Sequence, residues 1–279
     1  MKQKKFSLTG LLMLLLFIVI AALTLLPFVS IALASLRPGT ELMRQGLGLN
    51  LDFSKMTLAN YEYLFKGDHD YLIWFINSIK LTVVQTVLTL VVSAFVAYGF
   101  AMYDFRGKNL LFTCVLLVMM IPIEIIILPL YKLVISLKLI DTVWGIILPG
   151  IAGPLPIFFF RQYLSGIPRD FLDAARVDGC TEYGIFFRII MPLMKPSFAA
   201  MGIFVGMNSW NSLLWPMIVL RSSEKFTLPI GLTALINPYR NNYDLLLSGS
   251  VFAVIPILIL FLAFQKQFIA GMTAGGVKG

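Results

Sequence analysis

The chain has 279 residues, of which 59% are hydrophobic and only 13% are charged, with a formal net charge of +8. Its mean hydropathy is +0.88, whereas soluble domains are about half apolar and about one quarter charged. This composition excludes an ordinary soluble domain and indicates an integral membrane protein.

Six apolar segments are each near the ~20 residues that a bilayer-crossing helix needs. An open strand edge is not stable in hydrocarbon, so the segments are expected to be helices. The only acid within them is Glu124. The predicted fold is an all-α integral membrane protein with one transmembrane domain over residues 1–279. Its spans are predicted at about 8–36, 76–103, 109–131, 142–160, 197–220 and 245–264.

The first apolar segment follows a basic N-terminal stretch, Met1–Lys5, and ends near Ala32–Ala34, as a cleavable signal peptide would. Its apolar run of 29 residues exceeds the roughly 7–15 residues of a signal peptide. The length therefore favours an uncleaved anchor over a signal peptide.

The basic residues of the loops predict the orientation. With the N-terminus in the cytoplasm, 12 Lys and Arg lie inside and 10 outside, while the outer loops hold 8 acids against 5 inside. This bias predicts two cytoplasmic termini in a bacterial cell membrane and a cytoplasmic loop over residues 161–195. It also explains the positive net charge, which is no indication of nucleic-acid binding. Cys114 and Cys180 are kept apart by this topology, so no disulfide is expected.

The loop over 161–195 is predicted to form two short amphipathic helices. Pro168 suits the first turn of a helix and Gly179 the left-handed position after its end, so the first helix is expected at about 168–178. Thr181 suits the cap of a second helix, and Pro192 is expected to stop or kink it. Apolar residues gather on one side of each helix: Leu164, Phe171, Leu172 and Ala175 for the first, and Tyr183, Phe186, Phe187 and Ile190 for the second.

Two fates are reasonable for apolar surface in a cytoplasmic loop. The helices could lie against the membrane or fold under their own bundle. Alternatively, they could dock into a groove on a soluble partner. The local pattern does not separate these alternatives.

The residue identities favour docking. The stretch "DAARVDG", followed by "FFRIIMP", resembles the Glu-Ala-Ala (EAA) loop of binding-protein-dependent ABC importers. Asp173 stands where Glu is usual, and Cys180 where Ala is commoner; both departures put the choice of partner in question more than the role. The resemblance implies the type I importer permease fold, in which this loop forms a coupling helix wedged into a partner ATPase. The residues that it implies for coupling are Pro168, Phe171, Asp173, Ala174, Ala175, Asp178, Gly179 and Phe186.

Further stretches resemble the maltose-type carbohydrate permeases, specifically the shorter subunit of that heterodimer. They are "YDFRGKN" at 103–109, "FFFRQY" at 158–163, "WNSLLWP" at 210–216, "FTLPIGL" at 226–232 and the ending "AGMTAGGVKG". The stretches "PIEIIILP", "VDGCTEYGIFFRI" and "INPYRNNYDLLLSGS" are most similar to the permeases for arabinan oligosaccharides of Gram-positive bacteria. The resemblance implies a second homologous permease, two ABC ATPase subunits that bind ATP and Mg, and an extracellular sugar-binding lipoprotein. Selectivity in this family lies largely with the binding protein, so the sugar itself stays open.

Other functional classes fit less well. The chain has no G-x-x-x-x-G-K-[ST] sequence, so it is expected to bind no ATP and no other cofactor itself. Its single histidine, His69, is in an outer loop, which argues against an intramembrane hydrolase or a metal site. An ion-coupled secondary transporter is the stronger alternative, but it would normally show repeats and several ionisable groups at the midplane. An importer for a solute other than sugar also stays open.

A second set of candidate residues concerns the substrate path. Sugars stack on aromatic rings and hydrogen-bond to amides and acids, so Asn208, Trp210, Asn211 and Trp215 form a suitable strip, and Glu124 could face the pore. Helix packing, an interfacial aromatic belt and pairing within the bundle are equally good explanations for these residues. In the outer segment 221–244, the resemblance implies contact with the binding protein through Tyr239, Arg240, Asn241 and Asn242. A solvated loop is the alternative there.

Overall fold

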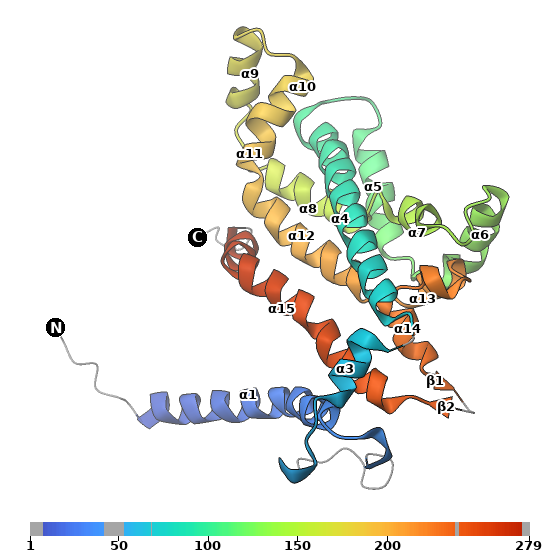
Figure 1. Ribbon diagram of the computed structural model, residues 1–279. Coiled ribbons are helices and arrows are strands. Elements are labelled where there is room, and N and C mark those ends of the chain that lie inside the picture. Colours follow the sequence, from blue (N-terminus) through green and yellow to red (C-terminus); the bar gives the residue numbers. More distant parts are fainter. Residues whose placement is uncertain (1–7, 42–52, 68, 238–239, 275–279) are drawn as a thin grey trace. The chain divides into compact units, whose positions relative to one another are not determined.

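The computed structural model describes residues 8–41, 53–67, 69–237 and 240–274 (Figure 1). These residues form two compact units, one made of residues up to 72 with 232–255 and the other of residues 73–231 with those from 256 onward. Apart from a short hairpin, the regular structure described is helical, which confirms the predicted all-α class.

The first unit contains the most apolar helix, α1 (Leu8–Ser35), in which every residue up to Val29 is exposed. Helix α3 (Ala59–Lys66) holds the end of α1, because the Asn60 amide donates to the carbonyl oxygens of Ser35 and Arg37, at 2.8 Å each. The Tyr61 hydroxyl lies 2.7 Å from that of Ser35. The remaining elements of this unit are the 3-10 turn η1 (Phe53–Lys55), the antiparallel pair β1 (Ile236–Asn237) and β2 (Arg240–Asn241), and the first part of α15 (Tyr243–Ala274).

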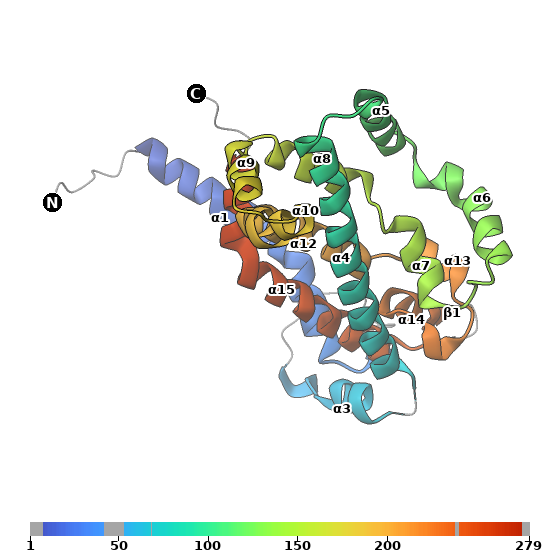
Figure 2. The ribbon, with the colours of Figure 1, turned by 90° about the horizontal axis from the view of Figure 1, so that it is seen from above.

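The second unit is a bundle that begins with most of the long helix α4 (Tyr71–Met102). It continues through α5 (Lys108–Met119), α6 (Ile123–Ser136), α7 (Val143–Gly150), α8 (Pro154–Leu164), α9 (Asp170–Val177), α10 (Glu182–Ile185), the π-helical turn η2 (Phe186–Ile190), α11 (Met191–Leu193), α12 (Lys195–Trp210), α13 (Leu214–Val219), the 3-10 turn η3 (Ser223–Lys225) and the start of α14 (Leu228–Ala234). Within this unit, α9 and α10 lie side by side at one end (Figures 1 and 2).

Three described helices are long and apolar enough to cross a membrane by themselves: Leu8–Ser35, Tyr71–Met102 and Tyr243–Ala263. Three further spans are bent pairs. Helices α5 and α6 meet at 104°, α7 and α8 at 43°, and the helix over Glu182–Leu193 meets α12 at 79°. Counting each pair as one span gives six, the predicted number, although the third pair begins at Glu182, inside the predicted loop. The bends interrupt the predicted spans 109–131 and 142–160, whereas 197–220 is interrupted between the end of α12 at Trp210 and the start of α13 at Leu214.

Prolines explain two of these bends. Pro122 lacks an N–H and restricts the residue before it, so α5 ends at Met119 and α6 begins at Ile123. Pro154 begins α8 three residues after Ile151, where α7 has ended. Broken helices at membrane depth are stable only where they are buried or line a cavity, because their free backbone groups need partners.

Asp141 joins two loops at the ends of these helices. It has a left-handed backbone (φ 58°), and its carboxylate accepts from the backbone N–H of Arg221 (2.9 Å), from the Ser222 hydroxyl (2.6 Å) and from the Lys225 ammonium (2.8 Å). These donors, led by Lys225, hold the pKa of Asp141 well below its ordinary value. We name this set of contacts the Asp141 clip.

Replacing Asp141 with alanine is expected to lower the free energy of unfolding by about 1–2 kcal/mol, because the backbone N–H groups of Arg221 and Ser222, the Ser222 hydroxyl and the Lys225 ammonium lose their acceptor. Thermal unfolding in detergent would measure the loss. Glu62→Ala is the matched control, since it removes an exposed acid that pairs with Lys66 within α3. Equal stability of the two variants would contradict a structural role of the clip.

Candidate coupling loop and pocket

The loop between α8 and α12 contains the two predicted helices. The first, α9, begins at Asp170, so Pro168 precedes the helix instead of occupying its first turn as predicted. Gly179 does take the left-handed conformation, with φ of 76°, and a Cβ built there meets nothing within 4 Å. Thr181 caps α10 by accepting from the backbone N–H of Gly184 at 3.1 Å. Pro192 lies inside the last helical turn, and the chain bends after it, at Met194.

The apolar side of α9 packs against its own bundle. Leu172 and Ala175 are buried in a cluster with Ala94, Tyr98 and Leu164. The expectation that another protein completes this side of the helix is therefore wrong, because α4 and α8 already cover it. Phe186 is also buried, stacked on Phe95 with ring centroids 4.1 Å apart. Ala175 and Phe186 thus support the loop from within and are closed to a partner.

Other apolar residues of the loop remain exposed. Val177 is 88% exposed, Tyr183 74% and Phe171 47%. They come from the two sides of the turn at Gly179, and the sequence pattern had not distinguished them from the buried residues. Asp173, Ala174 and Asp178 are exposed as well. The loop therefore has one side buried in its own bundle and an exposed side that carries both apolar and charged residues.

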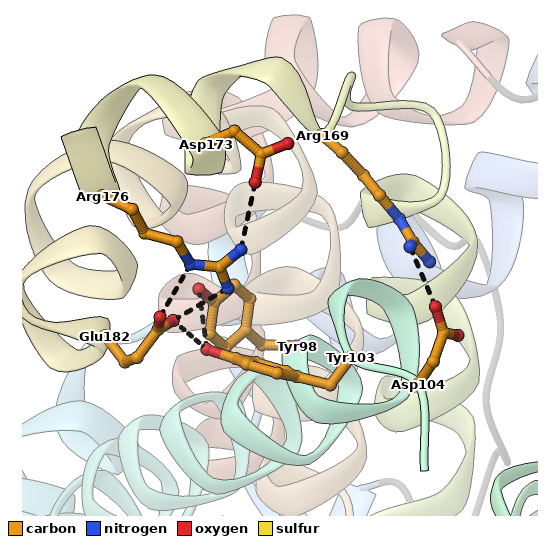
Figure 3. Close-up of polar contacts among 7 residues, drawn as sticks. All are labelled: Tyr98, Tyr103, Asp104, Arg169, Asp173, Arg176 and Glu182. Atoms are coloured by element: carbon orange, nitrogen blue, oxygen red, sulfur yellow. Dashed lines mark hydrogen bonds and ion pairs between the residues drawn. The ribbon is translucent and has the colours of Figure 1, made fainter.

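Polar contacts tie α9 to the end of α4 (Figure 3). The Arg176 guanidinium pairs with both carboxylate oxygens of Glu182, at 2.8 and 3.3 Å, and with Asp173 at 3.1 Å. The Tyr103 hydroxyl donates to the same Glu182 carboxylate. We name Tyr103, Arg176 and Glu182 the loop clamp. The sequence had singled out none of the three as a site residue, although each lies in a stretch that carried the resemblance: Tyr103 in "YDFRGKN", Arg176 in "DAARVDG" and Glu182 in "VDGCTEYGIFFRI".

A second tie lies beside the first residue of α9. Asp104 accepts from Arg169 at 2.9 Å and from Lys108 at 3.0 Å (Figure 3 shows the pair with Arg169). Arg169, followed by Lys108, lowers the pKa of Asp104 to about 2. Arg176, followed by Tyr103, holds the pKa of Glu182 below its ordinary value. Both carboxylates are therefore charged at physiological pH.

The loop contacts are expected to be insensitive to pH over the physiological range. The pKa values of Asp104 and Glu182 lie below the ordinary carboxyl values of about 4, so their contribution is complete above that pH and is lost only as pH falls below it, for Asp104 toward about 2. Limited proteolysis of the loop should proceed at the same rate from about pH 5.5 to about pH 8.5. A loop that opens between these values would contradict these ion pairs.

A pocket of about 750 Å³ lies between α6, α12 and α13. Four of its lining residues are polar: Glu124, Asn208, Asn211 and Ser212. Glu124 is in the first turn of α6, directly after the 104° bend, and is exposed. Within the described part of the chain it has no hydrogen bond or ion pair. We name this space the Glu124 pocket.

The structure brings together most of the predicted substrate-path residues. Asn208 and Asn211 donate to backbone oxygens of their own helix, each at 2.8 Å, which leaves each amide oxygen able to accept from a ligand. Trp215 is among the lining residues, and its indole N–H donates to the Gly145 oxygen at 3.2 Å. Trp210 does not belong to the strip, because it is buried on another side of α12 against Phe75.

The outer-loop residues are less well described. Tyr239 lies outside the described residues, as do the side chains of Arg240 and Asn241. Asn242 caps α15, because its amide oxygen accepts from the Leu245 N–H at 3.1 Å. Contact of these four residues with a binding protein stays a prediction.

The comparisons with known proteins agree with this geometry. Residues 89–273 match the family model described as binding-protein-dependent transport system inner membrane component. The chain is 54% identical to the arabinooligosaccharides transport system permease protein AraQ of Bacillus subtilis, over 99% of this chain and 98% of that protein. It is 52% identical to the AraQ protein of Halalkalibacterium halodurans over the full length of both chains.

A solved structure shares the fold. The crystal structure of a bacterial ABC transporter involved in the import of the acidic polysaccharide alginate contains a chain that superposes with a TM-score of 0.81. The match covers 96% of this chain and 99% of that chain, at 23% sequence identity.

The described helices include several that are apolar and long enough to cross a membrane, and the family match shows that this chain belongs to the binding-protein-dependent transport system inner membrane components. It is a multi-pass permease subunit of an ABC importer and not an enzyme. Such a subunit works with an ATPase and a binding protein.

Proposed function

We propose that this chain forms half of the pore of a sugar importer and that the sugar is an arabinan oligosaccharide. The observation that carries the proposal is the 54% identity, over 99% of the chain, to a protein named an arabinooligosaccharide permease. A lactose permease of Rhizobium radiobacter is 34% identical. The greater similarity favours arabinan oligosaccharides within a family that handles several sugars.

The partners are a second homologous permease, two ATPase subunits and an extracellular sugar-binding lipoprotein. ATP and Mg belong to the ATPase subunits. Both termini and the loop of α9 and α10 lie in the cytoplasm, in agreement with the distribution of Lys and Arg. The outer segment around Asn242 then lies on the side of the binding protein.

The loop suggests how the ATPase is engaged. Its base is fixed in the bundle, while Phe171, Val177 and Tyr183 are exposed around the turn at Gly179. Exposed apolar side chains on a rigid helix are suited to a groove on a soluble partner. Closure of the ATPase pair would move this helix, and the bundle would change between outward-facing and inward-facing states.

Reconstitution into liposomes tests the proposed function. The permease alone should take up no sugar, and uptake should require its partner permease, the ATPase, the binding protein and ATP together. Labelled arabinan oligosaccharide should enter, and lactose should not. Uptake by the lone chain would overturn the proposal, and preference for lactose would overturn the substrate.

The Glu124 pocket is proposed to line the sugar path. An uncharged sugar presents hydroxyls that need both acceptors and donors, and the pocket offers a carboxylate, two amide oxygens and an aromatic ring. A secondary transporter would need ionisable groups for ion coupling, but Glu124 is the only acidic or basic residue that lines this pocket among the described residues.

Replacing Asn208 with leucine is expected to lower sugar uptake about tenfold, because a hydrogen-bond acceptor is lost to an apolar side chain. ATP hydrolysis stimulated by the binding protein should persist. Asn77→Leu removes an amide outside the pocket and is the control. Uptake that is unchanged in the Asn208 variant would remove the pocket from the sugar path.

A further inference from the structure

The end of α4 and the start of α10 meet at one acidic side chain. Glu182 is the first residue of α10, and it accepts from Tyr103, which follows the last residue of α4, and from Arg176 on α9. The end of α4 therefore meets the neighbouring helices α9 and α10 at one carboxylate, although Tyr103 is 79 positions from Glu182 (Figure 3). The bidentate pairing fixes the relative orientation of the Arg176 and Glu182 side chains as well as their separation, because the planar guanidinium matches the carboxylate.

The aromatic partner extends this contact into the core. Tyr103 packs edge-on against Tyr98, with centroids 5.4 Å apart and hydroxyls 3.4 Å apart. Tyr98 is buried and packs in turn against Phe186. The Arg176 guanidinium also lies 6.0 Å from the Tyr103 ring, within the range of a cation–π contact. The loop clamp is thus continuous with the buried cluster beneath α9.

The loop clamp spans the left-handed turn at Gly179 and so restrains the angle between α9 and α10. Gly179 lies in the turn that connects α9 to α10. The space beside it is open, because a Cβ built there meets nothing within 4 Å. Arg176 lies before this turn and Glu182 after it, so their pairing closes the turn from outside. Without it, the angle between α9 and α10 would depend on the turn and on the buried side of α9 alone.

We propose that Glu182 is a positioning residue that fixes α9 to the end of α4, so that the coupling helix and α4 move as one body during transport. The inference rests on the proposed function, since it concerns how that function is transmitted. Movement of the coupling helix would then reach the bundle by two routes. One is α4, through Tyr103 and Arg176, and the other is the direct chain connection through α11 to α12.

The first test is Glu182→Gln in the complete importer, reconstituted in liposomes. The neutral amide loses the ion pair with Arg176 while its size is kept. We expect normal assembly with the ATPase and ATP hydrolysis near that of the wild type, but about three- to tenfold less sugar imported for each ATP hydrolysed. Glu62→Gln is the matched control, because it neutralises an equally simple exposed pair in α3. An unchanged ratio of sugar to ATP in the Glu182 variant would overturn the proposal.

A covalent replacement of the clamp provides the second test. Tyr103→Cys and Glu182→Cys are combined in a chain whose Cys114 and Cys180 are serine, and the pair is joined by bifunctional thiol reagents of increasing length. The two cysteine substitutions should lower the amount of sugar imported for each ATP hydrolysed. Cross-linking the two cysteines should restore it. If every reagent abolishes transport instead, the two segments must separate during the cycle and the proposal fails.

Gly179→Val separates this inference from the proposed function. If Gly179→Val transports normally, the loop does not couple to the ATPase and the proposed coupling is wrong. If Gly179→Val is inactive while Glu182→Gln keeps its ratio, the coupling stands and only the role of Glu182 is rejected. Glu182→Asp, which keeps the charge, should retain more coupling than Glu182→Gln.

Discussion

Replacing Gly179 with valine is expected to abolish transport while expression and membrane insertion stay near normal. At φ of 76°, any side chain strains the backbone by roughly 1–2 kcal/mol, and a β-branched side chain is the least tolerated. A Cβ at this position meets nothing within 4 Å, so the effect comes from the backbone and not from a clash. The turn would relax to another conformation, and the exposed residues of the loop would no longer be aimed at the ATPase.

A graded series tests this cause. Asn tolerates the left-handed region better than Ala or Val, so uptake should fall in the order Gly, Asn, Ala, Val. Gly99→Val is the matched control, because Gly99 also has free space around its Cβ but an ordinary helical backbone. Sugar uptake and co-purification of the ATPase should be measured together. Wild-type uptake by Gly179→Val would mean that the loop is not the coupling element.

The conservative change Asp173→Glu should be nearly silent. Asp173 is exposed and pairs with Arg176 across one helical turn, which Glu can also do. Glutamate is also the usual residue at this position of the EAA loop. A large loss of uptake in this variant would show that the shorter acid is itself required by the ATPase.

Replacing Gly231 with alanine is expected to have the largest effect on stability. A Cβ there would lie 2.0 Å from Cε3 and 2.1 Å from Cδ2 of Trp74. Trp74 is buried, and its indole N–H donates to the Ser223 oxygen at 2.9 Å, so the ring cannot simply turn away. The added methyl group should lower the free energy of unfolding by about 1–3 kcal/mol or more, because the packing must shift.

Thermal unfolding of the detergent-solubilised permease would measure this loss. Gly202→Ala is the control, since its Cβ would lie 3.6 Å from Leu90, an ordinary contact. Combining Gly231→Ala with Trp74→Phe should recover part of the stability, because the smaller ring makes room for the methyl group. A Gly231→Ala variant as stable as Gly202→Ala would show that the close approach to Trp74 does not limit the packing.

The sequence was sufficient for the class of the protein and for its local backbone signals. Apolar segments of about 20 residues must become helices in lipid, whatever their neighbours, so the all-α class followed from hydropathy alone. The left-handed turn at Gly179 and the cap at Thr181 were also predictable, because each depends on one residue and the few beside it.

Which face of each loop helix is covered was decided by the tertiary structure. Leu172 and Phe171 have similar hydrophobicity and are adjacent in sequence, yet one is buried under α4 and α8 and the other is exposed. Periodicity shows that a face is apolar but not what packs on it. The bend between α5 and α6 was missed because a hydropathy profile does not register direction, whereas the bend around Met194 lies close to Pro192, where a stop or kink was expected.

For the Glu124 pocket and the loop clamp, too, the sequence supplied the residues and the tertiary structure brought them together. The sequence supplied Glu124, Asn208 and Asn211 as polar groups in apolar segments, but only the fold placed them around one space and directed Trp210 elsewhere. Tyr103, Arg176 and Glu182 are separated by up to 79 positions and are ordinary loop residues by composition. Their convergence depends on how the end of α4 meets α9 and α10, because a hydrogen bond between residues as distant as Tyr103 and Glu182 leaves no periodic or spacing signal in the chain.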